Sequence, residues 1–79
     1  MNTNIELLKQ AVRHFGGQVA TSDRLGVSQA LVSKWVRELT ELSAEHAMGI
    51  ERESVGRYQA RQLRPDLPWP TVGSVSEAA

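Results

Sequence analysis

The sequence lacks cysteine and long apolar runs, and these two absences exclude several classes of protein. Without cysteine the chain has no disulfide framework, no thiolate zinc site and no cysteine nucleophile, which fits a reducing compartment. No stretch of about 18 consecutive apolar residues is present, and the N-terminus shows no basic leader followed by an apolar run. We therefore expect a cytoplasmic protein that is neither secreted nor inserted in a membrane.

The residue patterns of common catalytic and metal sites are also missing. His14 and His46 lie far apart in the sequence, and neither has acidic or cysteine residues at metal-ligand spacing. The serines form no recognisable nucleophile turn. Gly16-Gly17 is not followed by the Gly-Lys-Ser/Thr of a phosphate-binding loop. We therefore predict that the protein is not an enzyme and uses no metal or cofactor.

The net charge is low, but the charges are unevenly distributed. The 79 residues carry a formal net charge of zero, so composition alone does not indicate a nucleic-acid binder. Residues 1–37 have an excess of three positive charges, residues 38–53 an excess of four negative charges, and residues 54–66 an excess of two positive charges. One side of the folded protein can therefore be basic while another is acidic.

The first 17 residues have the pattern of an amphipathic helix. Thr3 and Glu6 have the spacing of a capping box, which predicts a helix that begins near Asn4. Gly16-Gly17 supplies the stop signal. Apolar residues follow the cap at helical spacing and predict a single buried face: Ile5, Leu8, Ala11, Val12 and Phe15.

Two short helical patterns come next, and residues 26–28 separate them. Gly26 suits the left-handed end of a helix over Gln18–Leu25, and Ser28 is a favoured N-cap for the next helix. A glycine, one apolar residue and a serine let two helices cross at a steep angle, as in a helix-turn-helix. The third helix is expected to bury a stripe of Val32, Trp35, Val36 and Leu39. The residues expected to hold the motif together are Gly26, Val27, Val32 and Trp35.

The rest of the chain predicts a small all-α bundle of four to five helices around this motif. A fourth helix is expected from Ser43 to about Glu51, and residues 57–63 form either a short helix or a strand. Three prolines hold residues 63–70 extended, and residues 71–79 are expected to be a flexible tail. We predict one helix-turn-helix DNA-binding domain over residues 1–70, with the motif at about 18–37.

The outward surface of the second motif helix is polar and positively charged. A helix of this kind fits the major groove of B-DNA, where its first turns reach base edges and its flanks meet phosphates. The alternative is an ordinary solvated helix face. The residues predicted to contact bases are Gln29, Ala30, Ser33 and Lys34.

Two segments resemble the small Cro-like phage repressors and the related YdaS-type regulators. They are "HFGGQVATSDRLGVSQALVSKW" and the later "LRPDLPW", and the resemblance covers about residues 5–70. It implies a DNA-binding regulator, expected to be a repressor, in which Gln18 contacts a phosphate and braces Gln29 against an adenine. The residues expected to contact phosphates are Gln18, Ser28, Arg37 and Arg13.

The sequence departs from this family at two places. Thr21-Ser22 stands where the family has an apolar residue followed by alanine, and we expect the two hydroxyls to bond back to the preceding turn. Leu31 stands where the family often has a small residue, so its side chain either reinforces the core or touches a thymine methyl group.

A single recognition helix buries too little surface to be selective, so a homodimer on a pseudo-palindromic operator is expected. The residues suggested for the dimer interface are Tyr58, Leu63, Leu67 and Trp69. Trp69 either folds back on its own domain or inserts into a partner subunit. The alternative function is a protein-interaction module or antitoxin-type regulator, in which the acidic residues 41–53 and the Pro-Trp tail bind a protein partner.

Overall fold

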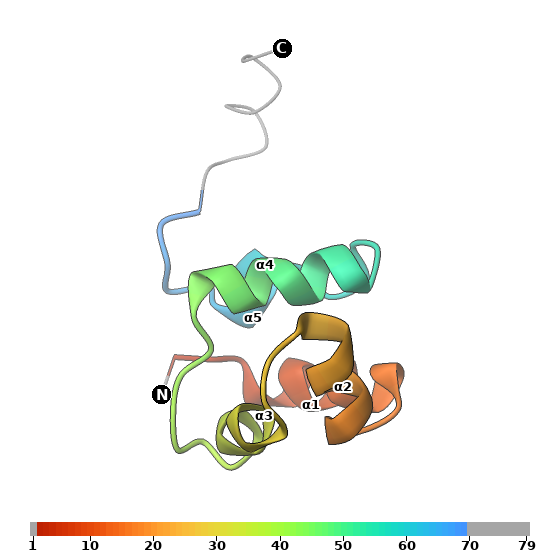
Figure 1. Cartoon of the computed structure of the whole chain (residues 1–79). Coiled ribbons are helices and arrows are strands. Elements are labelled where there is room, and N and C mark those ends of the chain that lie inside the picture. The colour runs from red at the N-terminus through yellow and green to blue at the C-terminus, as the bar shows by residue number, and fades with distance from the viewer. Residues whose placement is uncertain (1, 70–79) are drawn as a thin grey trace.

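The computed structural model describes residues 2–69, which fold into five helices and contain no strand (Figure 1). The helices are α1 (Ile5–Phe15), α2 (Gln18–Leu25), α3 (Gln29–Val36), α4 (Ala44–Glu53) and α5 (Ala60–Leu63). The all-α prediction is therefore confirmed, and residues 60–63 of the ambiguous segment are helix. The flexible tail predicted for residues 71–79 lies outside the described residues.

The core forms where α1, α3, α4 and α5 meet. α1 buries four of the five side chains that its spacing predicted and leaves Ile5 half-buried. α3 contributes Val32 and Trp35, which are 0% and 1% exposed. Leu42, Ile50 and Leu63 complete the centre of the core, and all three are fully buried. The apolar stripe predicted for α3 is wrong at its last position, because the helix ends at Val36 and leaves Leu39 61% exposed in the following connection.

The helix ends agree with most of the predicted capping signals. The Ser28 hydroxyl accepts a hydrogen bond from the Leu31 N–H at 3.1 Å, and the Ser43 hydroxyl accepts one from the His46 N–H at 3.2 Å. The predicted capping box at α1 is wrong: Asn4 is the N-cap, and its Oδ1 accepts from the Leu7 N–H at 3.3 Å. The helix still begins where its sequence predicted, because asparagine and threonine are both favoured caps.

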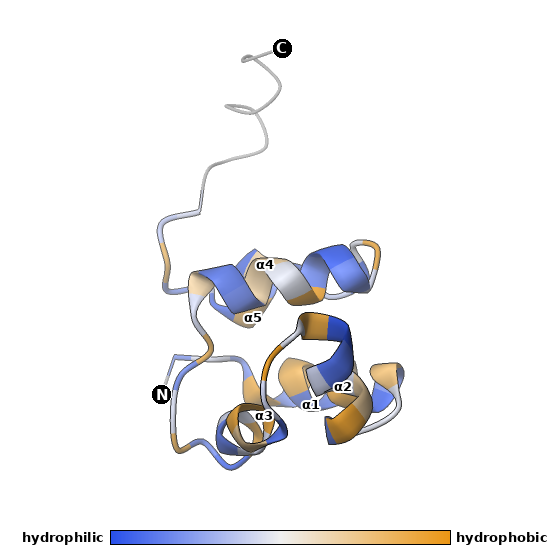
Figure 2. Ribbon diagram, viewed as in Figure 1, coloured by the Kyte–Doolittle hydropathy of each residue, from blue (hydrophilic) through white to orange (hydrophobic). Residues whose placement is uncertain are grey.

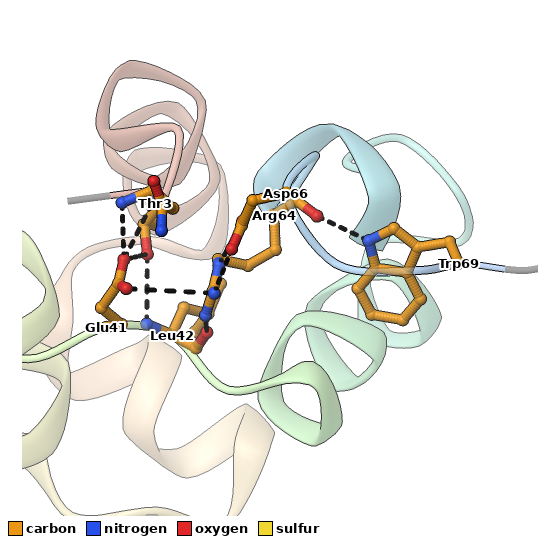
Figure 3. Close-up of polar contacts among 7 residues, drawn as sticks. Thr3, Glu41, Leu42, Arg64, Asp66 and Trp69 are labelled. Carbon is orange, nitrogen blue, oxygen red and sulfur yellow. Dashed lines mark hydrogen bonds and ion pairs between the residues drawn. The ribbon is translucent and has the colours of Figure 1, made fainter.

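Thr3 instead joins the N-terminus to the connection between α3 and α4. Its hydroxyl accepts a hydrogen bond from the Leu42 N–H at 3.2 Å. Glu41 Oε1 accepts bonds from the backbone N–H groups of Asn2 and Thr3, at 2.7 and 3.1 Å (Figure 3). These donors, led by the Asn2 N–H, lower the pKa of the Glu41 carboxyl below its usual range.

Arg64 extends this network to the C-terminal segment. The extended conformation predicted for the proline-rich segment is wrong at its start, because Leu63 belongs to α5 and residues 65–66 form a turn. Arg64 and Asp66 therefore meet in a two-point ion pair with N–O distances of 2.8 and 2.6 Å. Arg64 Nη1 also donates to the Leu42 carbonyl, and Nη2 lies 3.9 Å from Glu41 Oε2 (Figure 3). The hydrogen bond from Arg64 lowers the pKa of Asp66. We call Thr3, Glu41, Leu42, Arg64 and Asp66 the clamp.

Trp69 folds back on its own domain. Its ring is half-buried and packs against the core, and its Nε1 donates to the Arg64 carbonyl at 2.6 Å (Figure 3). The structure therefore shows Trp69 folded back on its own domain, the first of the two positions expected from the sequence.

Candidate nucleic-acid interface

The turn between α2 and α3 has the geometry that its sequence predicted. Gly26 has φ +69° and ψ +32°, in the left-handed region that glycine enters at low cost, and its N–H donates to the Ser22 carbonyl. The Val27 N–H donates to the same carbonyl at 3.1 Å. Ser28 then caps α3, so α2 and α3 cross within three residues.

The hydroxyl groups of Thr21 and Ser22, on the inner side of α2, both form hydrogen bonds. Thr21 is 0% exposed and Ser22 6% exposed. Thr21 Oγ1 donates to the Gly17 carbonyl and Ser22 Oγ to the Val19 carbonyl, each at 2.7 Å. The predicted back-bonding is confirmed, and it lets two hydroxyl side chains occupy a buried helix face without an unpaired donor.

Core contacts fix the inner side of α3. Trp35 is buried, and its ring centroid lies 5.1 Å from that of His46 on α4. Val27 and Leu31 are half-buried against the same core. Of the two roles considered for Leu31, the structure therefore has the core-reinforcing one. A helix anchored in this way keeps its outer side chains in a fixed orientation.

The outer side of α3 carries the predicted base-contacting residues. Gln29, Ala30 and Lys34 are exposed, and Ser33 is half-buried. Among residues 2–69, neither Lys34 nor Arg37 has a carboxylate within ion-pair distance. This side therefore offers hydrogen-bonding groups and two unpaired positive charges to an anionic polymer.

The predicted phosphate-contacting residues fall into two groups. Ser28 and Arg37 flank the two ends of α3 and are exposed. Arg13 and Gln18 lie at the other side of the molecule, next to the connection between α1 and α2; Arg13 is exposed and Gln18 is half-buried. The structure brings Gln18 and Gln29 to the starts of α2 and α3, the two packed helices of the motif.

The acidic helix α4 packs on α2 and also touches α3, because the His46 ring centroid lies 5.1 Å from that of Trp35. Figure 1 shows α4 at one side of the bundle, with α2 and α3 side by side below it. Glu51 accepts a hydrogen bond from the Ala60 N–H at 2.8 Å, and Glu53 pairs with Arg52 at 3.5 Å. Local contacts therefore occupy part of the acidic charge of α4.

Sequence comparisons agree with this geometry. The family described as "Bacterial toxin YdaS" matches residues 8–72, a range that includes both the motif and the clamp residues Arg64 and Asp66. The chain belongs to the YdaS family. The predicted resemblance is therefore confirmed.

Two relatives are named as regulators. The chain is 41% identical over 61 residues to the "Putative transcriptional regulator YdaS" of Escherichia coli (strain K12), a match that covers 77% of the chain and 62% of the relative. The chain thus spans less than two thirds of that relative's length. It is 34% identical over 70 residues to the "Regulatory protein cro" of Pseudomonas phage D3, which covers 89% of the chain and 96% of the relative. No solved structure gives a significant match.

The suggested dimer residues of this YdaS family member lie mostly inside its own fold. Leu63 is 0% exposed and Tyr58 7% exposed, because α5 and the segment before it pack against α1 and α4. Leu67 and Trp69 are half-buried. Tyr58 and Leu63 therefore stabilise the subunit, and a dimer interface built on them requires the core to open.

The clamp and the exposed Leu39 were not found from the sequence. The clamp partners Thr3 and Glu41 are 38 residues apart, and Arg64 and Leu42 are 22 residues apart, so no local pattern links them. The only signal was the "LRPDLPW" segment. Within residues 2–69 no group of three or more residues is placed to hold a metal ion, and no helix is long and apolar enough to cross a membrane.

Proposed function

We propose that this protein is a sequence-specific DNA-binding transcription regulator, a repressor that reads operator half-sites in the major groove with α3. The observation that carries the proposal is the exposed row of Gln29, Ala30 and Lys34 on a helix whose inner side is locked into the core by Val32 and Trp35. A rigid helix with a polar, positively charged outer side has the shape and chemistry of a major-groove reader.

The side chains have different roles in this proposal. The Gln29 amide presents a donor and an acceptor side by side, which matches the edge of an adenine, and Ala30 leaves room for close approach to the bases. Ser33 and Lys34 contact base edges further along the groove. Arg37, Ser28, Gln18 and Arg13 contact phosphates and fix the position of α3 on the duplex.

The names of the relatives support this reading at the level of regulation. Two copies on a pseudo-palindromic operator would place their recognition helices about 34 Å apart on one face of the DNA. Such a pair supplies the phosphate contacts and base contacts that one short helix lacks.

A fluorescence titration tests the proposal. Labelled DNA from the region upstream of the gene is titrated with protein beside a random duplex of equal length, at two salt concentrations. We expect tight binding to the upstream DNA that weakens with salt, and at least about 1,000-fold weaker binding to random DNA. Weak binding that ignores sequence would contradict the proposal and favour a protein partner instead.

A further inference from the structure

The connection between α3 and α4 presents a leucine to solvent. Leu39 is 61% exposed, although it directly follows the recognition helix. Its position is well defined, because its N–H donates to the Lys34 carbonyl at 2.9 Å and the Glu38 N–H donates to the Trp35 carbonyl at 3.1 Å. Glu38 itself has φ +61°, a conformation that residues with a side chain seldom adopt. Figure 2 shows this connection as mostly hydrophilic, interrupted by short apolar segments.

The charges beside Leu39 are self-complementary. Arg37 and Glu38 are both exposed, and neither forms an ion pair within the described part of the chain. If this side faced the DNA backbone, the Glu38 carboxylate would be repelled by the phosphates. A twofold axis beside Leu39 places Glu38 of each copy next to Arg37 of the other, with the two leucines between them, so that Arg37 stands between this carboxylate and the phosphates that it is proposed to contact.

The opposite flank of the molecule has a different character. There the connection between α1 and α2 carries Gly16-Gly17, with Arg13 and Gln18 on either side and no carboxylate among residues 13–22. Figure 1 shows this connection and the one between α3 and α4 on opposite sides of the bundle. One flank of the recognition helix thus suits phosphates, and the other suits a second copy of the chain.

We propose that residues 37–39 form the contact between two copies of this protein bound to adjacent half-sites. The proposal rests on the proposed function, since the DNA is what aligns the copies. Three residues bury far less than the roughly 1,200 Å² of a stable interface. The copies are therefore separate in solution and meet on DNA, where each raises the effective concentration of the other.

The test compares DNA with one half-site and DNA with two. The half-site is first selected from a pool of random duplexes, and probes then carry it once, or twice about 10 base pairs apart in inverted orientation. We expect the unmodified protein to bind the double probe cooperatively. Leu39→Asp should lose about tenfold in affinity for the double probe and keep its affinity for the single probe.

Val55→Asp is the matched control. Val55 is 92% exposed, lies at the other end of α4, and has φ +55°, which aspartate tolerates. It should leave both affinities unchanged. Glu38→Lys reverses a charge in the same contact, and it should weaken cooperativity through repulsion from Arg37 of the other copy.

The outcomes separate the two proposals. The proposed interface would be wrong if Leu39→Asp still bound the double probe cooperatively. It would also be wrong if the unmodified protein bound selectively but without cooperativity. Either result would leave the DNA-binding function intact. Failure to select any sequence would overturn both. A dimer that forms equally well without DNA, and resists Leu39→Asp, would place the contact elsewhere.

Discussion

Gln29 and Lys34 are both exposed on α3, but their chemistry assigns them different contributions to binding. An amide that reads a base edge contributes only on the matching sequence, whereas an ammonium group attracts the phosphates of any duplex. The difference can be measured because both side chains lie outside the core, so replacing them leaves the fold intact.

We expect Gln29→Ala to weaken binding to the cognate site by about 1–3 kcal/mol and to leave random DNA almost unaffected. Lys34→Ala should weaken binding to all sequences and reduce the slope of log affinity against log salt concentration by about one. Titrations of both variants on cognate and random duplexes at several salt concentrations check this. Equal losses for Gln29→Ala on the two kinds of DNA would exclude a base-reading role.

Gly49 is buried in the middle of α4, where glycine is a poor helix former. A Cβ at this position would lie 3.5 Å from Leu25 Cδ2 and 3.8 Å from an Arg52 nitrogen, which are ordinary contact distances. Gly49→Ala should therefore raise the free energy of unfolding by about 1 kcal/mol. Urea denaturation measures this effect. Gly56→Ala is the control and should be destabilising, because Gly56 has φ +81°.

At the scale of the helices, the crossing of α2 and α3 depends on Gly26. A Cβ at Gly26 would touch nothing within 4 Å, so the cost of a side chain there comes from the left-handed backbone alone. Gly26→Ala should lower the free energy of unfolding by about 1 kcal/mol. Gly26→Asn should cost less, since asparagine enters this conformation more easily. Thermal unfolding of the two variants compares them, and equal losses would contradict a cost that comes from the left-handed backbone.

The short helix α5 depends on contacts from distant parts of the chain. Four residues are too few to form a stable helix alone. The Glu51 carboxylate accepts a hydrogen bond from the Ala60 N–H, and the Leu63 carbonyl accepts one from the Asn4 N–H at 2.7 Å. α5 is therefore a consequence of the fold, which explains why residues 57–63 read equally well as helix or strand.

At the scale of the whole molecule, the clamp joins the N-terminus, the connection before α4 and the C-terminal segment. Glu41 and Asp66 both have folded-state pKa values below their ordinary 4.5 and 3.8. A carboxyl of lowered pKa stabilises the fold fully above its ordinary pKa, and this stabilisation disappears as the pH falls through the folded-state value. The clamp therefore makes the protein sensitive to acid.

We expect the melting temperature to be steady near neutral pH and to fall as the pH drops below about 4.5. Glu41→Gln combined with Asp66→Asn should lower the melting temperature at pH 7 and flatten its decline in acid. Circular dichroism melts over a pH series test this. Parallel curves for the variant and the unmodified protein would mean that other carboxyls cause the acid sensitivity.

The sequence by itself determined the features of this protein that depend on neighbours in the chain. Gly26, Val27 and Ser28 predicted the crossing of α2 and α3, and the apolar spacing predicted the buried face of α1, because caps, left-handed glycines and helical periodicity act within a few residues. The candidate base-reading residues followed from the same local periodicity, which places them opposite the buried Val32 and Trp35.

Only the tertiary structure decided which of these local features meet. It assigned Thr3 to the clamp instead of a capping box, buried Tyr58 and Leu63 within the subunit, and left Leu39 in solvent. The first two of these outcomes depend on residues about 20 to 60 positions away, whose approach is set by how the helices pack around one core. Local patterns carry no information about that approach. The sequence therefore predicted which helix a residue belongs to far better than which distant residue it contacts.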